Sequence, residues 1–309
     1  MKNFLNLKDI SANDLKKILL DARKRKNKRK NLNTLDIDKD APLKGKLLIQ
    51  MFEKSSLRTR LSFYLAIKQL GGGTLTLRAD ELHLTKGGES LADTAKILST
   101  YGNGFMLRTD SEKKIEEFKK FLNIPIINGL SPSAHPTQVL SDIFTIEEIK
   151  KRPISKLNIC WIGDSNNVLN SLISASVKFS FNLNIGCPNK YKPKKFVIDW
   201  LKKNKRKINI FNDAKKAIKN ADVVFSDKVI SLNDKVNEIK KTRDFKKFKI
   251  TSDLMKLAKK DSIFLHCLPR GSEVSDDVFL GSQSKVWQQA LNRIYVQKSI
   301  LLYCFGKLR

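Results

Sequence analysis

The residues that follow the apolar run 46–52 are of the types that bind anions in proteins. They read Ser56-Leu57-Arg58-Thr59-Arg60 and begin a helical pattern over residues 58–70. Amide groups at a helix start, hydroxyl groups and guanidinium groups together form a site for phosphate. The alternative is a capped helix with solvent-exposed arginines. Capping accounts for Ser56 but not for two arginines in one turn, so the segment favours phosphate binding.

Polar residues also follow two other apolar runs in the first half of the chain. Arg108 closes the run 104–108, which places a further cation at the end of a predicted strand. The run 124–127 leads to His135-Pro136-Thr137-Gln138 at the start of a helical pattern. A histidine beside Thr and Gln at a helix start indicates a polar pocket, and a core or capping histidine is the alternative.

The second half of the chain offers neutral and acidic groups at the corresponding places. Asn166 and Asn167 follow the run 157–162, without the glycines of a dinucleotide-binding fingerprint. Their amides can bind a small polar ligand. Asp227 follows the run 222–226, where it could hold an ammonium group or cap a helix.

A histidine and a cysteine end the last predicted strand, 262–266, in the sequence His266-Cys267-Leu268-Pro269. The pair invites a metal site or a thiol nucleophile. One such pair supplies too few ligands for zinc. The sequence shows no adjacent general base for a thiolate, so neither interpretation is favoured.

All these residues follow strand-like runs that alternate with helical patterns, which is typical of parallel α/β sheets. The predicted strands are 46–52, 74–78, 104–108, 124–127, 157–162, 182–186, 207–211, 222–226 and 262–266. Further helices are predicted over 90–101, 138–150 and 285–304. Ligands of open parallel sheets bind beyond the carboxyl ends of the strands, so the polar residues should gather there.

The length of 309 residues fits two α/β domains, each a parallel sheet flanked by helices. The basic, proline-containing break at 151–156 favours a boundary after the helix 138–150. We expect a first domain over 1–138, a connector helix over 139–150 and a second domain over 151–284. The C-terminal segment 285–309 is expected to return to the first domain.

The net charge of +29 raises the possibility of nucleic-acid binding. Most of the 60 basic residues are lysines spread over predicted helix faces, whereas nucleic-acid sites favour arginine patches with interleaved aromatics. We expect no specific nucleic-acid partner, although weak attraction to polyanions follows from the charge.

No apolar run is long enough to span a membrane, so no membrane partner is expected. The basic N-terminal segment contains Asp9, Asp14 and Asp21, unlike organelle transit peptides, which favours a cytoplasmic location. Four cysteines show no metal-finger spacing and are expected to be reduced.

Taken together, the segments resemble the aspartate/ornithine carbamoyltransferase family over nearly the whole chain. Ser56 to Arg60, Arg108-Thr109 and His135 to Gln138 resemble the carbamoyl-phosphate site of that family. Asn166-Asn167, Asp227 with Ser231, and His266 to Pro269 resemble its ornithine branch. Cys267 discriminates between the branches, because the aspartate branch usually has His-Pro-Leu-Pro.

The resemblance implies a metal-free and cofactor-free transfer of the carbamoyl group from carbamoyl phosphate to the δ-amine of L-ornithine. The products are citrulline and phosphate, in arginine biosynthesis or a urea-cycle-type step. It also implies a homotrimer or a multiple of trimers. The residues expected to bind carbamoyl phosphate are Ser56, Leu57, Arg58, Thr59, Arg60, Arg108, His135, Pro136, Thr137 and Gln138. Those expected to bind ornithine are Asn167, Asp227, Ser231, Leu232, Cys267, Leu268 and Arg293.

Three of these residues are expected to act at the reacting atoms. Arg108 and His135 would polarise the carbamoyl oxygen, and backbone carbonyls near Cys267 would aim the δ-amine. The chain departs from the family pattern at several positions. Leu57 replaces the usual Thr, Leu84 replaces a Gln that reaches a neighbouring subunit's site, and residues 228–233 lack the usual Trp, Met and Gly.

Two alternatives remain open from the sequence. The altered residues 228–233 suggest another amine, such as an N-acylated ornithine or putrescine. The net charge of +29 suggests a non-catalytic polyanion-binding protein that reuses the fold.

Overall fold

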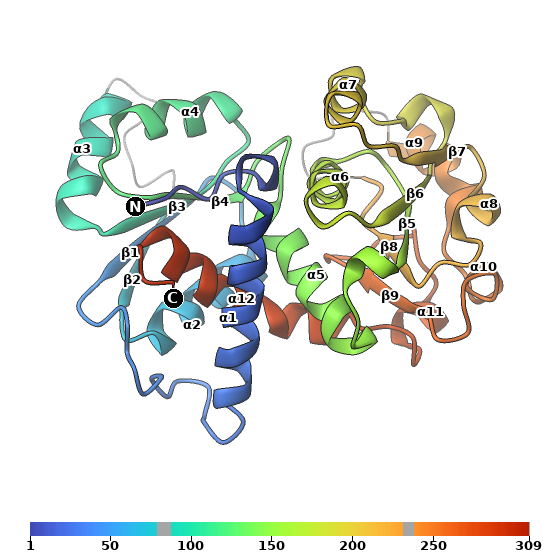
Figure 1. The fold of residues 1–309 in the computed structure, drawn as a ribbon. Coiled ribbons are helices and arrows are strands. Elements are labelled where there is room, and N and C mark those ends of the chain that lie inside the picture. The colour runs from blue at the N-terminus through green and yellow to red at the C-terminus, as the bar shows by residue number, and fades with distance from the viewer. Residues whose placement is uncertain (79–87, 231–237, 309) are drawn as a thin grey trace. The chain divides into compact units, whose positions relative to one another are not determined.

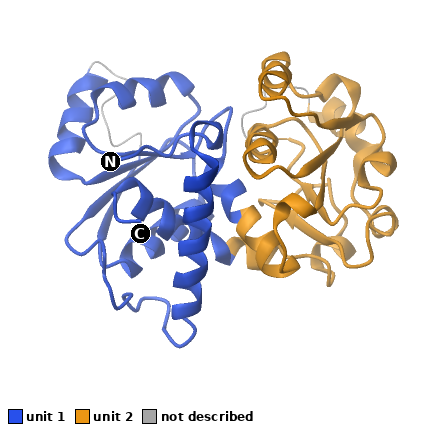
Figure 2. Ribbon diagram, in the orientation of Figure 1, with its two compact units in different colours: residues 1–141, 291–309 blue, residues 142–290 orange. Residues whose placement is uncertain are grey.

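The chain forms two α/β units, each built around its own parallel sheet (Figure 2). The computed structural model describes residues 1–78, 88–230 and 238–308. Unit 1 comprises residues 1–141 and 291–309, and unit 2 comprises residues 142–290. The division falls within the helices α5 (Pro136–Lys150) and α12 (Val286–Cys304). The predicted fold class is confirmed, including the C-terminal helix whose last part belongs to the first unit.

Unit 1 contains a four-stranded parallel sheet in the order β2-β1-β3-β4. Its strands are β1 (Leu47–Phe52), β2 (Gly73–Arg78), β3 (Gly104–Arg108) and β4 (Ile126–Leu130). Its further helices are α1 (Ala12–Lys28), α2 (Leu57–Gln69), α3 (Leu91–Tyr101) and α4 (Glu112–Phe121). Helices α3 and α4 lie on one face of the sheet and α1, α2 and α12 on the other (Figure 1).

Continuous burial along the central strands β1 and β3 shows that helices cover both faces of the sheet. Ile49 and Met51 of β1 pack with Leu98 of α3 and Phe118 of α4 in one buried cluster. Successive strand residues point to opposite faces, so the buried residues between them serve the other layer. The carboxyl ends of β1 and β3 are thereby held rigidly at one edge.

The strand β4 begins two residues later and ends three residues later than predicted, and it continues through Asn128 and Gly129. The N-terminal segment explains this difference. Phe4 forms a parallel bridge with Ile127, and Asn128 donates to the carbonyl of Leu5 at 3.0 Å. A polar residue can therefore continue a buried strand, because the remote residue Leu5 accepts a hydrogen bond from its side-chain NH2 group.

Unit 2 contains a five-stranded parallel sheet in the order β7-β6-β5-β8-β9. Its strands are β5 (Asn158–Ile162), β6 (Asn182–Gly186), β7 (Asn209–Phe211), β8 (Val223–Ser226) and β9 (Ile263–His266). Its further helices are α6 (Asn167–Phe179), α7 (Lys195–Lys203), α8 (Ala214–Ile218), α9 (Glu238–Phe245), α10 (Ser252–Met255) and α11 (Asp276–Leu280). Helices α8, α10 and α11 contribute to one buried cluster with β5, β8 and β9.

Each of the nine predicted strands has a counterpart in the structure. Within the described ranges, no helix is both long and apolar enough to cross a membrane.

Candidate functional site

The carboxyl edge of the unit 1 sheet carries the first group of predicted site residues. Phe52, the last residue of β1, pairs in register with Arg108, the last residue of β3. Four residues after β1, the side chain of Ser56 caps α2 by accepting the amide of Thr59 at 3.3 Å. The helix start, its cap and Arg108 thus belong to neighbouring strand ends, as the alternation of strands and helices predicts.

Arg293 of α12 lies among these residues, although its side chain comes from the other end of the sequence. It is buried and donates to Thr59 Oγ1 at 2.9 Å and to Gln138 Oε1. Arg293 is expected from the sequence to bind ornithine, whereas within unit 1 it contacts two residues of the expected carbamoyl-phosphate set. Its immediate effect is to orient the Thr59 hydroxyl and the Gln138 amide.

His135 is buried at the N-terminus of α5, and the positive charges of three arginines act on its ring. Burial lowers the pKa of His135 well below its usual range, and the positive charges of Arg293, Arg108 and Arg58 lower it further. The imidazole is therefore neutral at neutral pH and can still donate one hydrogen bond. Such a group beside several guanidinium groups suits a ligand that carries both a negative charge and a carbonyl oxygen.

The other members of the predicted carbamoyl-phosphate set take different positions. Leu57 is 69% exposed, and Pro136 is buried at the start of α5. The hydroxyl of Thr137 is buried and has no hydrogen-bond partner among the residues that the structure describes. Arg60 is exposed, and its guanidinium group stacks on Phe52 at 5.3 Å from the ring centroid.

The carboxyl edge of the unit 2 sheet gathers the second group around Asp227. One carboxylate oxygen accepts the thiol of Cys267 at 2.8 Å and the other accepts the amide of Asn166 at 2.6 Å. Asp227 follows β8, Cys267 follows β9, and Asn166 is the N-cap of α6. Asp227 is therefore not a helix cap but the centre of a polar cluster formed from three strand ends.

Asn166 donates its side-chain NH2 group to Asp227, whereas Asn167 is the residue that was expected to hold the ornithine carboxylate. The Oδ1 atom of Asn166 accepts the amides of Val168 and Leu169, so its NH2 group is directed away from the helix start. Asn167 is the first residue of α6 and is half-buried. The sequence offers two adjacent asparagines, and only the helix boundary distinguishes their roles.

Some of the predicted residues lie outside the described part of the chain. These are Ser231 and Leu232 of the expected ornithine set, and Leu84.

An ion pair that the sequence analysis missed lies next to the Asp227 cluster. Lys241 of α9 is buried and donates to Asp164 at 2.5 Å. Asp164 follows β5, and its carbonyl accepts the indole N–H of Trp161 at 3.2 Å. The pair joins α9 to the loop that carries Asn166. A lysine in a strongly basic sequence gives no signal by which this role could be recognised.

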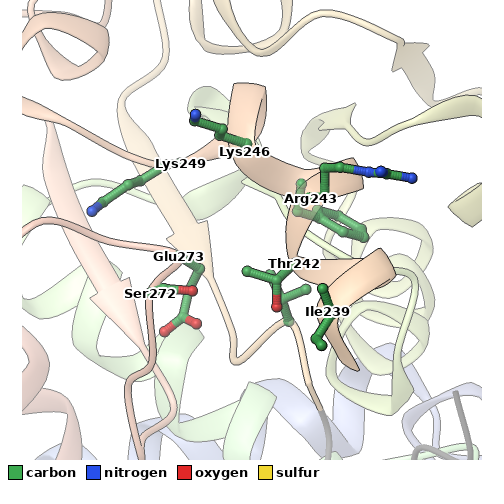
Figure 3. A pocket seen from close by; sticks show the side chains of 9 residues that line it. Ile239, Thr242, Arg243, Lys246, Lys249, Ser272 and Glu273 are labelled. Atoms are coloured by element: carbon green, nitrogen blue, oxygen red, sulfur yellow. The ribbon is translucent and has the colours of Figure 1, made fainter. Parts of the chain in front are cut away.

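Unit 2 also contains a cavity of about 450 Å³ beside α9 (Figure 3). Its walls come from three segments: Val229, residues 239–249, and the pair Ser272 and Glu273. Among the described residues, none of the predicted site residues lines this cavity. The described residues also include no group of three His, Cys, Asp or Glu side chains arranged to hold a metal ion.

Comparison with known proteins matches two family models to successive parts of the chain. Residues 2–148 match the carbamoyl-P binding domain of aspartate/ornithine carbamoyltransferase, and residues 155–304 match the Asp/Orn binding domain. The chain belongs to the aspartate/ornithine carbamoyltransferase family. The predicted family and the enzyme class, a carbamoyltransferase, are confirmed.

Relatives within the family cover the whole chain. The ornithine carbamoyltransferase of Agrobacterium fabrum is 38% identical over 99% of this chain and 98% of the relative. Among solved structures, ornithine carbamoyltransferase from Pyrococcus furiosus has a TM-score of 0.91 and 37% identity, with 100% and 98% of the two chains covered. Anabolic ornithine carbamoyltransferase from Campylobacter jejuni has a TM-score of 0.89 and 35% identity, with 99% and 100% covered.

The neutral state of His135 predicts a loss of stability in mild acid. In the unfolded chain a histidine binds a proton near its usual pKa of about 6.5, whereas folded His135 does not. The free energy of unfolding that this pKa difference contributes is therefore fully present above that pH. It declines as the pH falls below it, by up to about 1.4 kcal/mol per pH unit. Urea unfolding between neutral pH and mild acid measures it.

The variant His135→Gln isolates this effect, because glutamine does not titrate. The free energy of unfolding of the variant should lose the part of the slope that corresponds to one proton. Equal slopes for the two proteins in this pH range would show that His135 titrates normally in the folded chain.

Proposed function

We propose that this chain transfers the carbamoyl group from carbamoyl phosphate to the δ-amine of ornithine, which gives citrulline and phosphate. The observation that carries the proposal is the buried, neutral His135 in the field of Arg58, Arg108 and Arg293 at one sheet edge. An acyl phosphate with about two negative charges needs several cations, and its carbonyl oxygen needs a hydrogen-bond donor that holds its proton.

In the proposed reaction, the lone pair of a neutral δ-amine attacks the carbamoyl carbon. The new C–N bond forms, the bond from carbon to the phosphate oxygen breaks with its electron pair going to that oxygen, and the nitrogen passes a proton to the departing phosphate. Arg58, Thr59 and the amides at the start of α2 would hold the phosphate. Arg108 and His135 would donate to the carbamoyl oxygen as negative charge develops on it, and Gln138 would orient the carbamoyl amide.

The unit 2 cluster is the proposed site for ornithine. Asp227, with Ser231, would accept the α-amino group, and Asn167 would hold the carboxylate. Backbone carbonyls of Cys267 and Leu268 would accept hydrogen bonds from the δ-amine and aim its lone pair. The thiol of Cys267 already donates to Asp227 at 2.8 Å, so it serves to fix the carboxylate rather than as a nucleophile.

The test is a citrulline assay with purified protein, carbamoyl phosphate and ornithine, with putrescine and N-acetylornithine as competing amines. We expect citrulline from ornithine at a rate well above that from either competitor. Exclusive use of an acylated or decarboxylated amine would overturn the choice of ornithine while keeping carbamoyl transfer. Absence of all turnover would overturn both.

A place in arginine biosynthesis, a cytoplasmic location and a homotrimeric assembly complete the proposal. The family resemblance motivates the pathway and the assembly, and the acidic residues of the N-terminal segment motivate the location. Sedimentation equilibrium checks the assembly, for which we expect three times the chain mass of 35.3 kDa or a multiple of that.

The cluster around Asp227 predicts a selective loss of ornithine affinity in Asp227→Asn. The variant removes the charge that would pair with the α-ammonium group and places an NH2 group beside a present donor, Asn166 or Cys267. A hydrogen bond to a charged group contributes about 1.5–3 kcal/mol, so KM for ornithine should rise about tenfold to a hundredfold.

Asp244→Asn is the matched control, since Asp244 accepts the hydroxyl of Tyr191 at 3.0 Å elsewhere in unit 2. Steady-state kinetics at saturating carbamoyl phosphate measure both variants. If Asp227→Asn keeps the KM of the wild type, Asp227 does not bind the amino acid.

A further inference from the structure

Strand β9 ends at His266, and both nitrogens of its buried ring take part in hydrogen bonds. Nδ1 accepts the backbone amide of Leu268 at 2.9 Å. Nε2 lies 3.1 Å from Oε1 of Glu273, whose side chain is also buried. The same Oε1 atom accepts the amide of Gly271 at 2.5 Å. One carboxylate oxygen of Glu273 thus links the side chain of His266 to the backbone of Gly271 within the turn 266–273.

The partners of the ring define its tautomer. A backbone amide can only donate, so Nδ1 must be the acceptor and carry no proton. The proton is therefore on Nε2, where it is donated to Glu273. The opposite tautomer would direct an N–H group at the Leu268 amide and leave Nε2 as a lone pair facing a carboxylate.

This arrangement holds the backbone where it departs from ordinary geometry. Leu268 has a φ of +60°, a left-handed conformation that is unfavourable for a branched side chain. Its amide is bonded to His266, and the amide of His266 is bonded to Gln289 Oε1 at 3.1 Å. The amide of the Cys267–Leu268 peptide is therefore held by the buried ring of His266, whose own backbone amide is held by Gln289.

We propose that Glu273 is a positioning residue for the amine substrate, acting through the Nε2–H tautomer of His266 on the backbone of Cys267 and Leu268. The inference rests on the proposed function, in which carbonyls of these two residues accept hydrogen bonds from the δ-amine. A change of tautomer would release the Leu268 amide and turn the carbonyls away from the attacking nitrogen.

A contribution to folding stability does not by itself explain why His266 and Glu273 form a buried polar pair. Burial raises the pKa of Glu273, the hydrogen bonds from His266 and Gly271 are among the causes that lower it, and the net direction is downward. A buried carboxylate beside a neutral ring costs desolvation that an apolar pair would avoid. What the carboxylate of Glu273 provides is a fixed orientation of the His266 ring, since an acceptor beside Nε2 selects the Nε2–H tautomer.

The choice of variants follows from the surroundings of Glu273. Glu273 borders the 450 Å³ cavity, where it is drawn beside Ser272 (Figure 3), so an alanine there would leave room for water. Glu273→Leu removes the acceptor and keeps the volume. Glu273→Gln retains Oε1, which makes both hydrogen bonds, and is the conservative variant. Asp276→Asn is the control for charge in the same segment, since it pairs at the surface with Arg270.

Kinetics provide the first readout. A misplaced acceptor for a reacting nitrogen costs about tenfold to a hundredfold, so we expect KM for ornithine to rise and kcat to fall in Glu273→Leu. Binding of carbamoyl phosphate should be unchanged, and Glu273→Gln and Asp276→Asn should behave like the wild type. A wild type without citrulline formation would refute the proposed function itself. A citrulline-forming wild type with unchanged kinetics in Glu273→Leu would refute only this inference.

The ring tautomer provides the second readout, which a merely structural role would not move. The chain has three histidines, so ¹⁵N-histidine spectra of the folded wild type can be assigned by substitution. We expect His266 as the Nε2–H tautomer at neutral pH in the wild type and in Glu273→Gln. Glu273→Leu should lose that signature. A protonated or Nδ1–H ring at position 266 in the wild type overturns the proposal, even if Glu273→Leu does not fold.

Discussion

Replacing Arg108 with alanine is expected to lower turnover with carbamoyl phosphate and ornithine about a hundredfold or more. Arg108 ends β3 in register with the end of β1, and its charge acts on the buried ring of His135. A donor aligned before the reaction with developing charge contributes about 2.7–4 kcal/mol to the transition state, which corresponds to the expected loss. The deficit should be in kcat more than in the KM for ornithine.

The control for this variant is Arg23→Ala, which removes the same group from an exposed position on α1 of unit 1. Initial rates of citrulline formation at saturating concentrations of both substrates compare the two proteins. Methylguanidine in the assay could restore part of the lost rate to Arg108→Ala only. Near-full activity of Arg108→Ala would mean that His135 is neutral for structural reasons and that the carbamoyl oxygen binds elsewhere.

Replacing Asp38 with alanine is expected to lower the free energy of unfolding of unit 1 by about 3–5 kcal/mol, the usual cost of breaking a buried ion pair. Asp38 accepts Lys298 at 2.7 Å, Arg29 at 2.8 Å and Arg25 at 3.2 Å. Burial lowers the pKa of Lys298 to about 8, even though Asp38 raises it. Without the carboxylate, three cations would share one buried site.

Hydrogen exchange in α1 and α12 measures the effect, because both helices contribute to this cluster. All three tryptophans, Trp161, Trp200 and Trp287, belong to unit 2, so their fluorescence during urea unfolding serves as an internal reference. Asp40→Ala is the matched control. Asp40 pairs with Arg25 but is more than half exposed, and its loss should cost less than about 1 kcal/mol. Comparable hydrogen-exchange rates in Asp38→Ala and Asp40→Ala would mean that Asp38 contributes no more to the free energy of unfolding than the exposed Asp40 does.

The sequence alone was sufficient to predict the strands and the order of the functional segments. Strand and helix periodicity depends on neighbouring residues, so the nine strands could be located without coordinates. In a parallel sheet every strand ends at the same edge, so residues that follow β1, β3, β8 and β9 could be assigned to sheet edges in advance. The strand β4 was predicted to begin two residues and end three residues too early, because its polar continuation depends on the remote residues Phe4 and Leu5.

Which side chain contacts which could not be predicted in the same way. Arg293, Lys298 and Glu273 reach their partners across long stretches of chain or from a turn without a periodic pattern. Nothing local distinguishes the buried Lys298 from the many exposed lysines, because burial is decided by the packing of α12 on α1 and α2. Likewise, Asn166 donates to Asp227 because its position as N-cap of α6 turns its side-chain oxygen to the helix amides and its NH2 group away from them.

The protonation states belong entirely to the folded chain. A histidine in the sequence has one ordinary pKa, and only the burial of His135 beside three arginines makes it neutral. The tautomer of His266 is likewise defined by an amide and a carboxylate that the turn after β9 brings together. Sequence therefore predicts which residues lie at the strand ends, and tertiary structure decides their charge and direction, because both depend on groups that only folding places nearby.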